Sequence, residues 1–233
     1  MTNRLRESGS VPGNSAVWTA ANSALLGWRM RLADLRGRGV YAGYPNAHRC
    51  IFVHIPKTAG SSITQALFGA PSRHVPYFVY QRANPIKFHR YFKFAFVRNP
   101  WDRLVSTYFF LREGGLNWQD RQWSERNLAG YGDFGGFVRG WLTPENAYSW
   151  IHFMPQSHFI CNQAGDLMVD FVGRFERLTD DFDVVARRLG LAANLPLTNQ
   201  SEHAPFAAYY DSETRDIVRL VYSRDIEAFG YAD

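Results

Sequence analysis

The sequence has few of the residues that form disulfide frameworks, structural zinc sites or membrane spans. Cys50 and Cys161 are the only cysteines among 233 residues, too few for a disulfide framework or a zinc site, and a reducing compartment is the default. No run of eighteen apolar residues occurs, and the longest early candidate, residues 23–30, is broken by Arg29. We therefore expect a cytoplasmic protein with neither a membrane span nor a secretory signal.

Lysine is also scarce, although the chain is basic, with a formal charge of +5 and a pI of about 9.3. Lys57, Lys87 and Lys93 are the only lysines, so nearly all cations are arginine. The cations are spread along the chain instead of forming a tail or stripe, which suits anionic ligands and is weak evidence for nucleic acid. No nucleic-acid partner is expected.

The length and the 46% hydrophobic content fit one α/β domain with an appendage. We expect an N-terminal extension over residues 1–48 and a catalytic-size domain over residues 49–233. Residues 1 to about 15 are polar and should be loosely attached, whereas apolar residues at steps of three and four over 18–35 predict an amphipathic helix ending near Gly37. This helix could lie on the domain's own surface, form a homodimer contact or rest on a membrane surface.

Residues 51–68 read IFVHIPKTAGSSITQALF and predict a strand, a tight loop and a helix. Backbone amides at the start of such a helix lack intrahelical partners and lie where the helix dipole is positive. Glycine allows close backbone approach, hydroxyls add donors and the lysine adds a full charge. We therefore expect a phosphate or sulfate ester to bind here, held by Lys57, Thr58, Ala59, Gly60, Ser61 and Ser62.

The order of residues in this loop differs from the nucleotide-triphosphate loop, G-x-x-x-x-G-K-[ST]. Lys57 precedes the only glycine, Gly60, and no K-[ST] pair follows that glycine. The pattern argues against a Walker-type ATPase and favours a different phosphate loop, with the lysine at its entrance.

Residues 91–112 form a second strand-to-helix unit, with strand alternation over 92–97. Asn99 is a good N-cap, and Pro100 and Asp102 suit the first helical turn. Arg98 falls at the carboxyl end of the strand, where ligands collect in parallel sheets, and Ser106 lies two turns into the helix. A guanidinium running back beside the helix could meet the hydroxyl around one phosphate.

The rest of the chain gives weaker signals. We expect an irregular segment between the two motifs, a substrate-facing loop region over 114–147 with a short helix near Phe134, and ordinary packing for most of 150–160. A strand is expected within 167–175, a helix capped by Thr179 and closed by Gly190, and a last helix from about Ser212. No metal site is expected, because the histidines lack a recognisable ligand spacing.

Together the two motifs resemble those of sulfotransferases that use 3′-phosphoadenosine 5′-phosphosulfate (PAPS), in the carbohydrate branch with the heparan sulfate 2-O-sulfotransferases and many bacterial enzymes. The likeness covers about 51–231, with softer matches at HFMPQSHFI, VGRFERLTDDF and the last stretch. The resemblance implies a bacterial enzyme and a three-layer α/β/α sandwich around a mostly parallel sheet, in agreement with the units above.

The resemblance also implies residue roles. The P-K-T-type loop would hold the 5′-phosphosulfate, and Arg98 with Ser106 would grip the 3′-phosphate. Lys57 would stabilise the leaving group, and the nucleotide product would be adenosine 3′,5′-bisphosphate. No metal ion would be required. His74 stands where related bacterial sequences carry a histidine, and is the candidate base; His89 and His152 are the alternatives, and His54 is expected in the core.

Two other functions stay open from the residues alone: a P-loop-type kinase, and a non-catalytic nucleotide- or glycan-binding protein on the same scaffold. The acceptor is expected to be a hydroxyl on a glycan or glycolipid, on resemblance. Asn199 and Ser201 are candidates for closing over the adenosine.

Overall fold

The computed structural model describes residues 14–195 and 204–232. Its sheet has three strands, β1 (Cys50–Phe52), β2 (Phe92–Val97) and β3 (Phe171–Arg174), in the order β1-β2-β3. Both pairings are parallel, with Phe52 beside Phe94 and Phe94 beside Phe171. The expected α/β architecture with a parallel sheet is confirmed.

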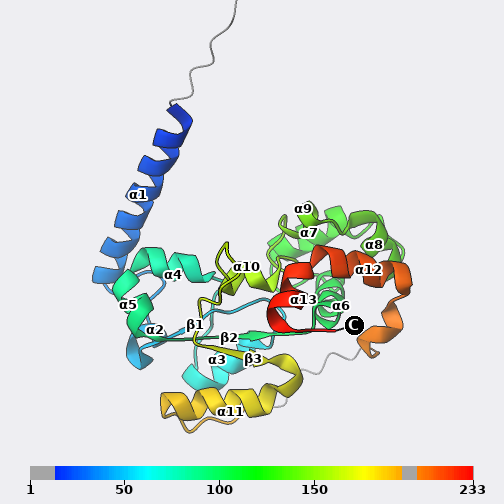
Figure 1. The fold of residues 1–233 in the computed structure, drawn as a ribbon. Coiled ribbons are helices and arrows are strands. Elements are labelled where there is room, and N and C mark those ends of the chain that lie inside the picture. The colour runs from blue at the N-terminus through cyan, green and yellow to red at the C-terminus, as the bar shows by residue number, and fades with distance from the viewer. Residues whose placement is uncertain (1–13, 196–203, 233) are drawn as a thin grey trace, which may run out of the picture.

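Helices cover both faces of this sheet, as Figure 1 shows. Alternate strand residues point to opposite faces, so Phe52, Phe94 and Phe96 pack on one side, and Ile51, Ala95 and Val97 on the other. The first side is covered by α3 (Gly60–Phe68) and α11 (Leu178–Leu189). The second is covered by α4 (Tyr77–Ala83), α5 (Pro85–Arg90), α10 (Gln156–Ile160) and α13 (Ser223–Phe229).

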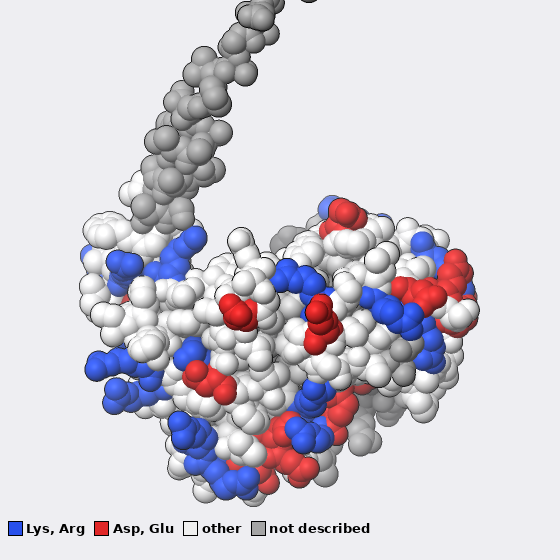
Figure 2. Space-filling view, viewed as in Figure 1, with Lys and Arg blue, Asp and Glu red and all other residues white. Residues whose placement is uncertain are grey.

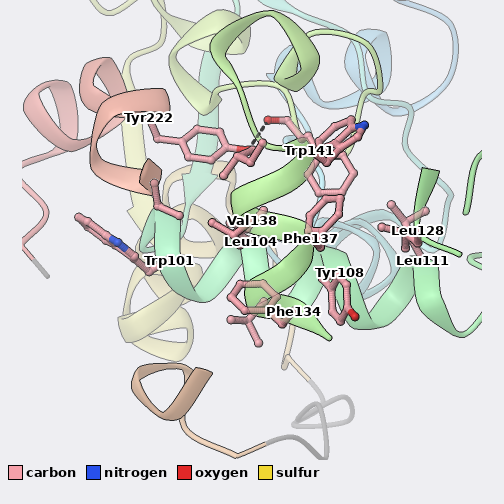
Figure 3. Packing of buried hydrophobic residues seen from close by; sticks show 14 of the residues in the cluster. Trp101, Leu104, Tyr108, Leu111, Leu128, Phe134, Phe137, Val138, Trp141 and Tyr222 are labelled. Carbon is pink, nitrogen blue, oxygen red and sulfur yellow. Dashed lines mark hydrogen bonds between the residues drawn. The ribbon is translucent and has the colours of Figure 1, made fainter. Parts of the chain in front are cut away.

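A further hydrophobic core lies beside the sheet (Figure 3) and is built around α6 (Pro100–Arg112). In Figure 3, Trp141, Phe137 and Tyr108 lie close together, and the Tyr222 hydroxyl donates to the Phe153 carbonyl at 2.8 Å. The other helices here are α7 (Trp118–Asn127), α8 (Phe134–Trp141), α9 (Pro144–Ala147) and α12 (Ser212–Val221).

This core corrects the expectation of a substrate-facing loop region over 114–147. Most of that stretch is helical, and its aromatic residues, including Trp123 and Trp141, are buried against α6. They are therefore not available to stack on sugar rings. Trp118 remains exposed in this stretch, as does Tyr148 directly after it.

Other element boundaries also differ from expectation. The segment between the motifs is not irregular but holds α4 and α5, because Pro76 and Pro85 suit helix starts and the Asn84 side chain accepts from Lys87 N–H. Thr179 is not a cap, since α11 begins one residue earlier. Gly190 does close α11, at φ 67°.

The N-terminal helix α1 (Asn14–Leu35) is confirmed and is followed by α2 (Tyr44–His48). Figure 1 shows α1 projecting from the body beside α4. Within the described residues, no helix combines the length and apolar character needed to cross a membrane. The division at residues 48/49 stays a prediction, and Asn199 and Ser201 lie outside the described residues.

Short 3₁₀ turns at Phe175–Arg177 and Phe206–Tyr209 complete the described elements. Cys50 and Cys161 are both buried, free thiols.

Candidate functional site

The loop between β1 and α3 has an unusual backbone. Lys57 and Ala59 adopt left-handed φ values of 67° and 63°, a conformation that costs an L-residue roughly 1–2 kcal/mol. Ala59, the N-cap of α3, offers no side-chain oxygen, and the first backbone bond of the helix runs from Ile63 N–H to the Ala59 carbonyl. The amides that begin α3 are thus left without a capping side chain, which suits an external anion.

Gly60 is required by its contact with His54. A Cβ on Gly60 would lie 1.9 Å from Cδ2 and 2.1 Å from Nε2 of the His54 ring. This ring is 3% exposed and is held by a 2.6 Å hydrogen bond between its Nδ1 and the Ser72 hydroxyl. His54 is thus a core residue, as expected, and it presses directly against the start of α3.

The three hydroxyls of the loop are not equivalent. Thr58 is fully buried and donates to the Ile55 carbonyl at 2.9 Å, so its hydroxyl proton serves the loop itself. Ser61 is exposed and Ser62 half-buried. The Thr58 hydroxyl therefore does not act as a free donor as expected, and Ser61 and Ser62 remain the candidate hydroxyl donors.

The Lys57 ammonium lies in a largely buried position, with Nζ 4.1 Å from the centre of the Phe110 ring. Burial, and next the positive charge of Arg98, lower the pKa of Lys57 to about 8. The side chain therefore remains mostly protonated at neutral pH but loses its charge in mildly alkaline solution.

Arg98 joins the second motif to the first. Its Nη1 donates to the Lys57 carbonyl at 3.3 Å, and its Nε and Nη2 donate to the two Asp102 oxygens at 2.7 and 2.9 Å. The guanidinium also lies 4.0 Å from the Phe175 ring centre. Asn99 caps α6 as expected, accepting from Trp101 N–H, while Ser106 is buried on that helix. The hydrogen bonds of the Arg98 side chain thus go to Asp102 and Lys57.

Arg103 is a residue that sequence reasoning missed. Although 2% exposed, it donates from Nε to the Pro56 carbonyl at 3.1 Å and from Nη2 to the His152 and Met154 carbonyls at 3.1 and 2.7 Å. It therefore ties the phosphate-loop candidate to the HFMPQ stretch. The available signal was its position among the apolar residues of α6, where a charge needs a buried partner.

His74 lies beside His54 at this loop, with ring centres 4.2 Å apart. Its Nδ1 is 3.1 Å from the His54 carbonyl, an acceptor only, so Nδ1 carries the proton and the neutral ring keeps its lone pair on Nε2. Burial is the main cause that lowers the pKa of His74 below the usual 6.5. The ring is therefore neutral at pH 7, as a proton acceptor must be.

His152 approaches the same place from the 150–160 stretch, where ordinary packing was expected. Its ring centre is 5.9 Å from that of His74, and its Nε2 is 3.2 Å from the buried Asp120 carboxylate. Its Nδ1 is buried and finds no hydrogen-bond partner among the described residues. Burial lowers the pKa of His152 to about 4, although Asp120 opposes the shift.

The remaining histidine candidate does not join this group, because His89 is exposed in the last turn of α5. Gln156 has a structural role: its side chain bonds both the N–H and the carbonyl of Arg98. In the described residues, no cluster of three or more His, Cys, Asp or Glu side chains could hold a metal ion.

The site thus combines an uncapped helix start, a lysine, two arginines and two adjacent imidazoles, a set suited to moving an anionic group between oxygens. A family model described as a sulfotransferase family matches residues 45–232. The chain belongs to the sulfotransferase family. Membership supports sulfuryl transfer in general and does not favour the kinase interpretation.

Similarity to individual proteins is limited. An uncharacterized protein of Archaeoglobus fulgidus is 29% identical to this sulfotransferase-family chain over 109 residues, which are 46% of this chain and 75% of that protein. No solved structure matches the chain.

Proposed function

We propose that this family member transfers the sulfuryl group of PAPS to a hydroxyl of a carbohydrate acceptor. The observation that supports the proposal is the hydrogen bond from Arg98 to the Lys57 carbonyl, which brings the two candidate anion-binding motifs together. A donor with phosphate groups at both its 5′ and 3′ positions needs two such anchors in reach of each other.

The donor would bind between the two strand ends. Amides 58–62 and the Ser61 and Ser62 hydroxyls would hold the 5′-phosphosulfate, and Arg98 with Ser106 would hold the 3′-phosphate. In this role the Asp102 carboxylate, which engages two nitrogens of Arg98, competes with the incoming phosphate. The protein's cations supply the positive field that a metal ion supplies in kinases, so none is needed.

The transfer step follows from the same groups. The acceptor oxygen forms a bond to sulfur while its proton passes to Nε2 of His74, and the bridging S–O bond breaks with its electron pair going to the 5′-phosphate oxygen. The Lys57 ammonium offsets the charge that develops there. The products are the sulfate ester and adenosine 3′,5′-bisphosphate.

His152 completes the acceptor side of the proposal. With its Nε2 facing Asp120, a neutral His152 keeps Nδ1 as an acceptor, and this buried atom could take a hydrogen bond from a neighbouring hydroxyl of the sugar. Both rings keep one nitrogen lone pair, so their tautomers do not separate the two roles. We assign the base to His74, which stands where related bacterial sequences carry a histidine, and acceptor positioning to His152.

The test compares nucleotides and one variant. Adenosine 3′,5′-bisphosphate should raise the melting temperature without Mg²⁺, whereas ATP should not, and Arg98→Ala should reduce the bisphosphate affinity to that of adenosine 5′-monophosphate. Labelled PAPS then reports transfer over a panel of glycans, lipopolysaccharide and simple alcohols. Tight binding of the bisphosphate without transfer to any acceptor would indicate the non-catalytic alternative. Stabilisation by ATP that depends on Mg²⁺ would contradict the assignment of PAPS as the donor.

A further inference from the structure

Acidic residues are distributed very unevenly along the chain. Between Ser8 and Trp101 the sequence contains twelve lysines and arginines but one carboxylate, Asp34, whereas nineteen of the twenty-one acidic residues follow Trp101. The cations are spread evenly, as expected from the sequence, but the anions are not. The N-terminal half therefore carries a strong positive charge that the overall value of +5 conceals.

The one carboxylate of this segment is not on the surface. Asp34 is 5% exposed, and it accepts from Lys87 Nζ at 2.8 Å and from Asn84 Nδ2 at 2.7 Å. These bonds attach the last turns of α1 to α5. The exposed surface contributed by residues 25–101 is consequently free of carboxylates and carries arginines from α1, α4, α5 and the loops, and Figure 2 shows basic residues prevailing around the base of α1.

Helix α1 also presents apolar side chains to solvent. Its inner side, with Met30 and Asp34, packs on the body, whereas Leu25, Trp28 and Leu35 are 59%, 62% and 81% exposed. At 100° per residue these three and the half-buried Leu32 occupy a stripe roughly 80° wide on the outer side of the helix. Arg31 borders the stripe on one side, and Arg29 and Arg36 border it on the other.

Two kinds of occupant fit this stripe poorly. In a second copy packed through the same stripe, Arg29, Arg31 and Arg36 would face their own counterparts, and like charges beside a helix seam are destabilising. A soluble polyanion would neutralise the arginines but leave Trp28 and its leucine neighbours in water.

An anionic bilayer satisfies both features. Leucine and tryptophan side chains insert at the boundary of headgroups and acyl chains, while arginines bind lipid phosphates on either side. We propose that α1 and the basic surface that residues 25–101 contribute around its base form a docking surface for anionic membranes. The proposal does not depend on the enzymatic function.

Co-sedimentation of the full chain with lipid vesicles tests the proposal. Binding is expected to vesicles that contain phosphatidylglycerol and not to phosphatidylcholine alone, and to weaken with added salt. Each replacement among Arg29→Gln, Arg31→Gln and Arg36→Gln should lower partitioning about fivefold. The triple change Leu25→Ala, Trp28→Ala and Leu35→Ala should lower it at least about tenfold.

Matched controls come from the other end of the molecule, where Leu116 and Trp118 are 85% and 67% exposed. Leu116→Ala with Trp118→Ala, and Arg121→Gln with Arg126→Gln, should leave vesicle binding unchanged. Equal binding to neutral vesicles, or binding to heparin but to no vesicle, would overturn the proposal. So would a dimer, measured by light scattering, that the apolar triple variant converts to monomer.

Discussion

The His54 ring occupies the space into which any side chain on Gly60 would project. The ring itself is fixed by Ser72 and packs 5.4 Å from Phe52, centre to centre, so it has little freedom to move aside. The start of α3 in the candidate anion-binding loop is thus constrained by His54, which lies just after β1.

Gly60→Ala should therefore displace either the ring or the helix start. We expect a loss of about 1–3 kcal/mol in the free energy of unfolding, typical of overpacking, and a loss of affinity for adenosine 3′,5′-bisphosphate. Gly130→Ala is the matched control, because no atom lies within 4 Å of the added Cβ. Urea denaturation and calorimetric titration measure the two effects. Unchanged affinity in Gly60→Ala would show that the loop does not hold the donor.

The lowered pKa of Lys57 predicts an alkaline limit to donor binding. The cationic form attracts the bisphosphate, so from about pH 7, where both phosphates are largely dianionic, affinity should change little until the pH nears the pKa of about 8, and then fall by up to tenfold per pH unit. Lys57→Arg keeps its charge at these pH values and should abolish this decline, whatever it does to affinity at pH 7. A decline of the same midpoint in Lys57→Arg would assign the titration to another group.

His74 and His89 should differ sharply in their effect on turnover. His74→Ala is expected to lower kcat by about 10²–10⁴ with bisphosphate affinity retained, because only proton transfer is lost. His89→Ala, at an exposed histidine between the same two motifs, should have no effect.

The same assignment predicts an acid limb. Because burial lowers the pKa of His74, and the base must be neutral, kcat/KM should stay constant down to pH 6.5 and decline only below it.

The matching experiment on His152→Gln should raise the KM for the acceptor and leave donor affinity unchanged. A larger fall of kcat in His152→Gln than in His74→Ala would reverse the two roles.

Arg103→Lys should be severely destabilising although it conserves the charge. A lysine cannot reach three carbonyls with the geometry of a guanidinium, and unpaired buried carbonyls cost about 1–3 kcal/mol each. We expect the free energy of unfolding to fall by more than about 3 kcal/mol. Arg112→Lys, on the exposed side of the same helix, should change it by less than about 0.5 kcal/mol. Equal effects in the two variants would contradict the bracing role of Arg103.

Sequence patterns located the local units of this fold well. Strand alternation, the Asn99 cap and Pro100 together predicted β2 and α6 to the residue, because these signals act within a few positions. The predictions from these patterns were wrong where tertiary packing determines which residues are buried. Over 114–147 the side chains of Asn117, Asp133 and Thr143 cap three helices, but the sequence does not show that the aromatic residues between them are buried against α6.

The candidate site was predictable only in part for the same reason. Lys57 and Arg98 lie in recognisable motifs, and the structure joins them. By contrast, the pairing of His152 with Asp120 spans a long separation in sequence, and nothing near either residue indicates the other. The contact of His54 with Gly60 could not be predicted either. A histidine among apolar neighbours is expected in the core, but the sequence does not show which residue its ring contacts.

The buried guanidinium of Arg103 also sets a length. It spans from the Pro56 carbonyl to the carbonyls of His152 and Met154, so the loop and the imidazole segment are kept at one separation by a planar group with little freedom. In-line transfer tolerates only small errors in the spacing of nucleophile, sulfur and leaving oxygen. Under the proposed function, acceptors would therefore be selected by how far their hydroxyl reaches between the loop and the imidazole segment, whose separation is fixed.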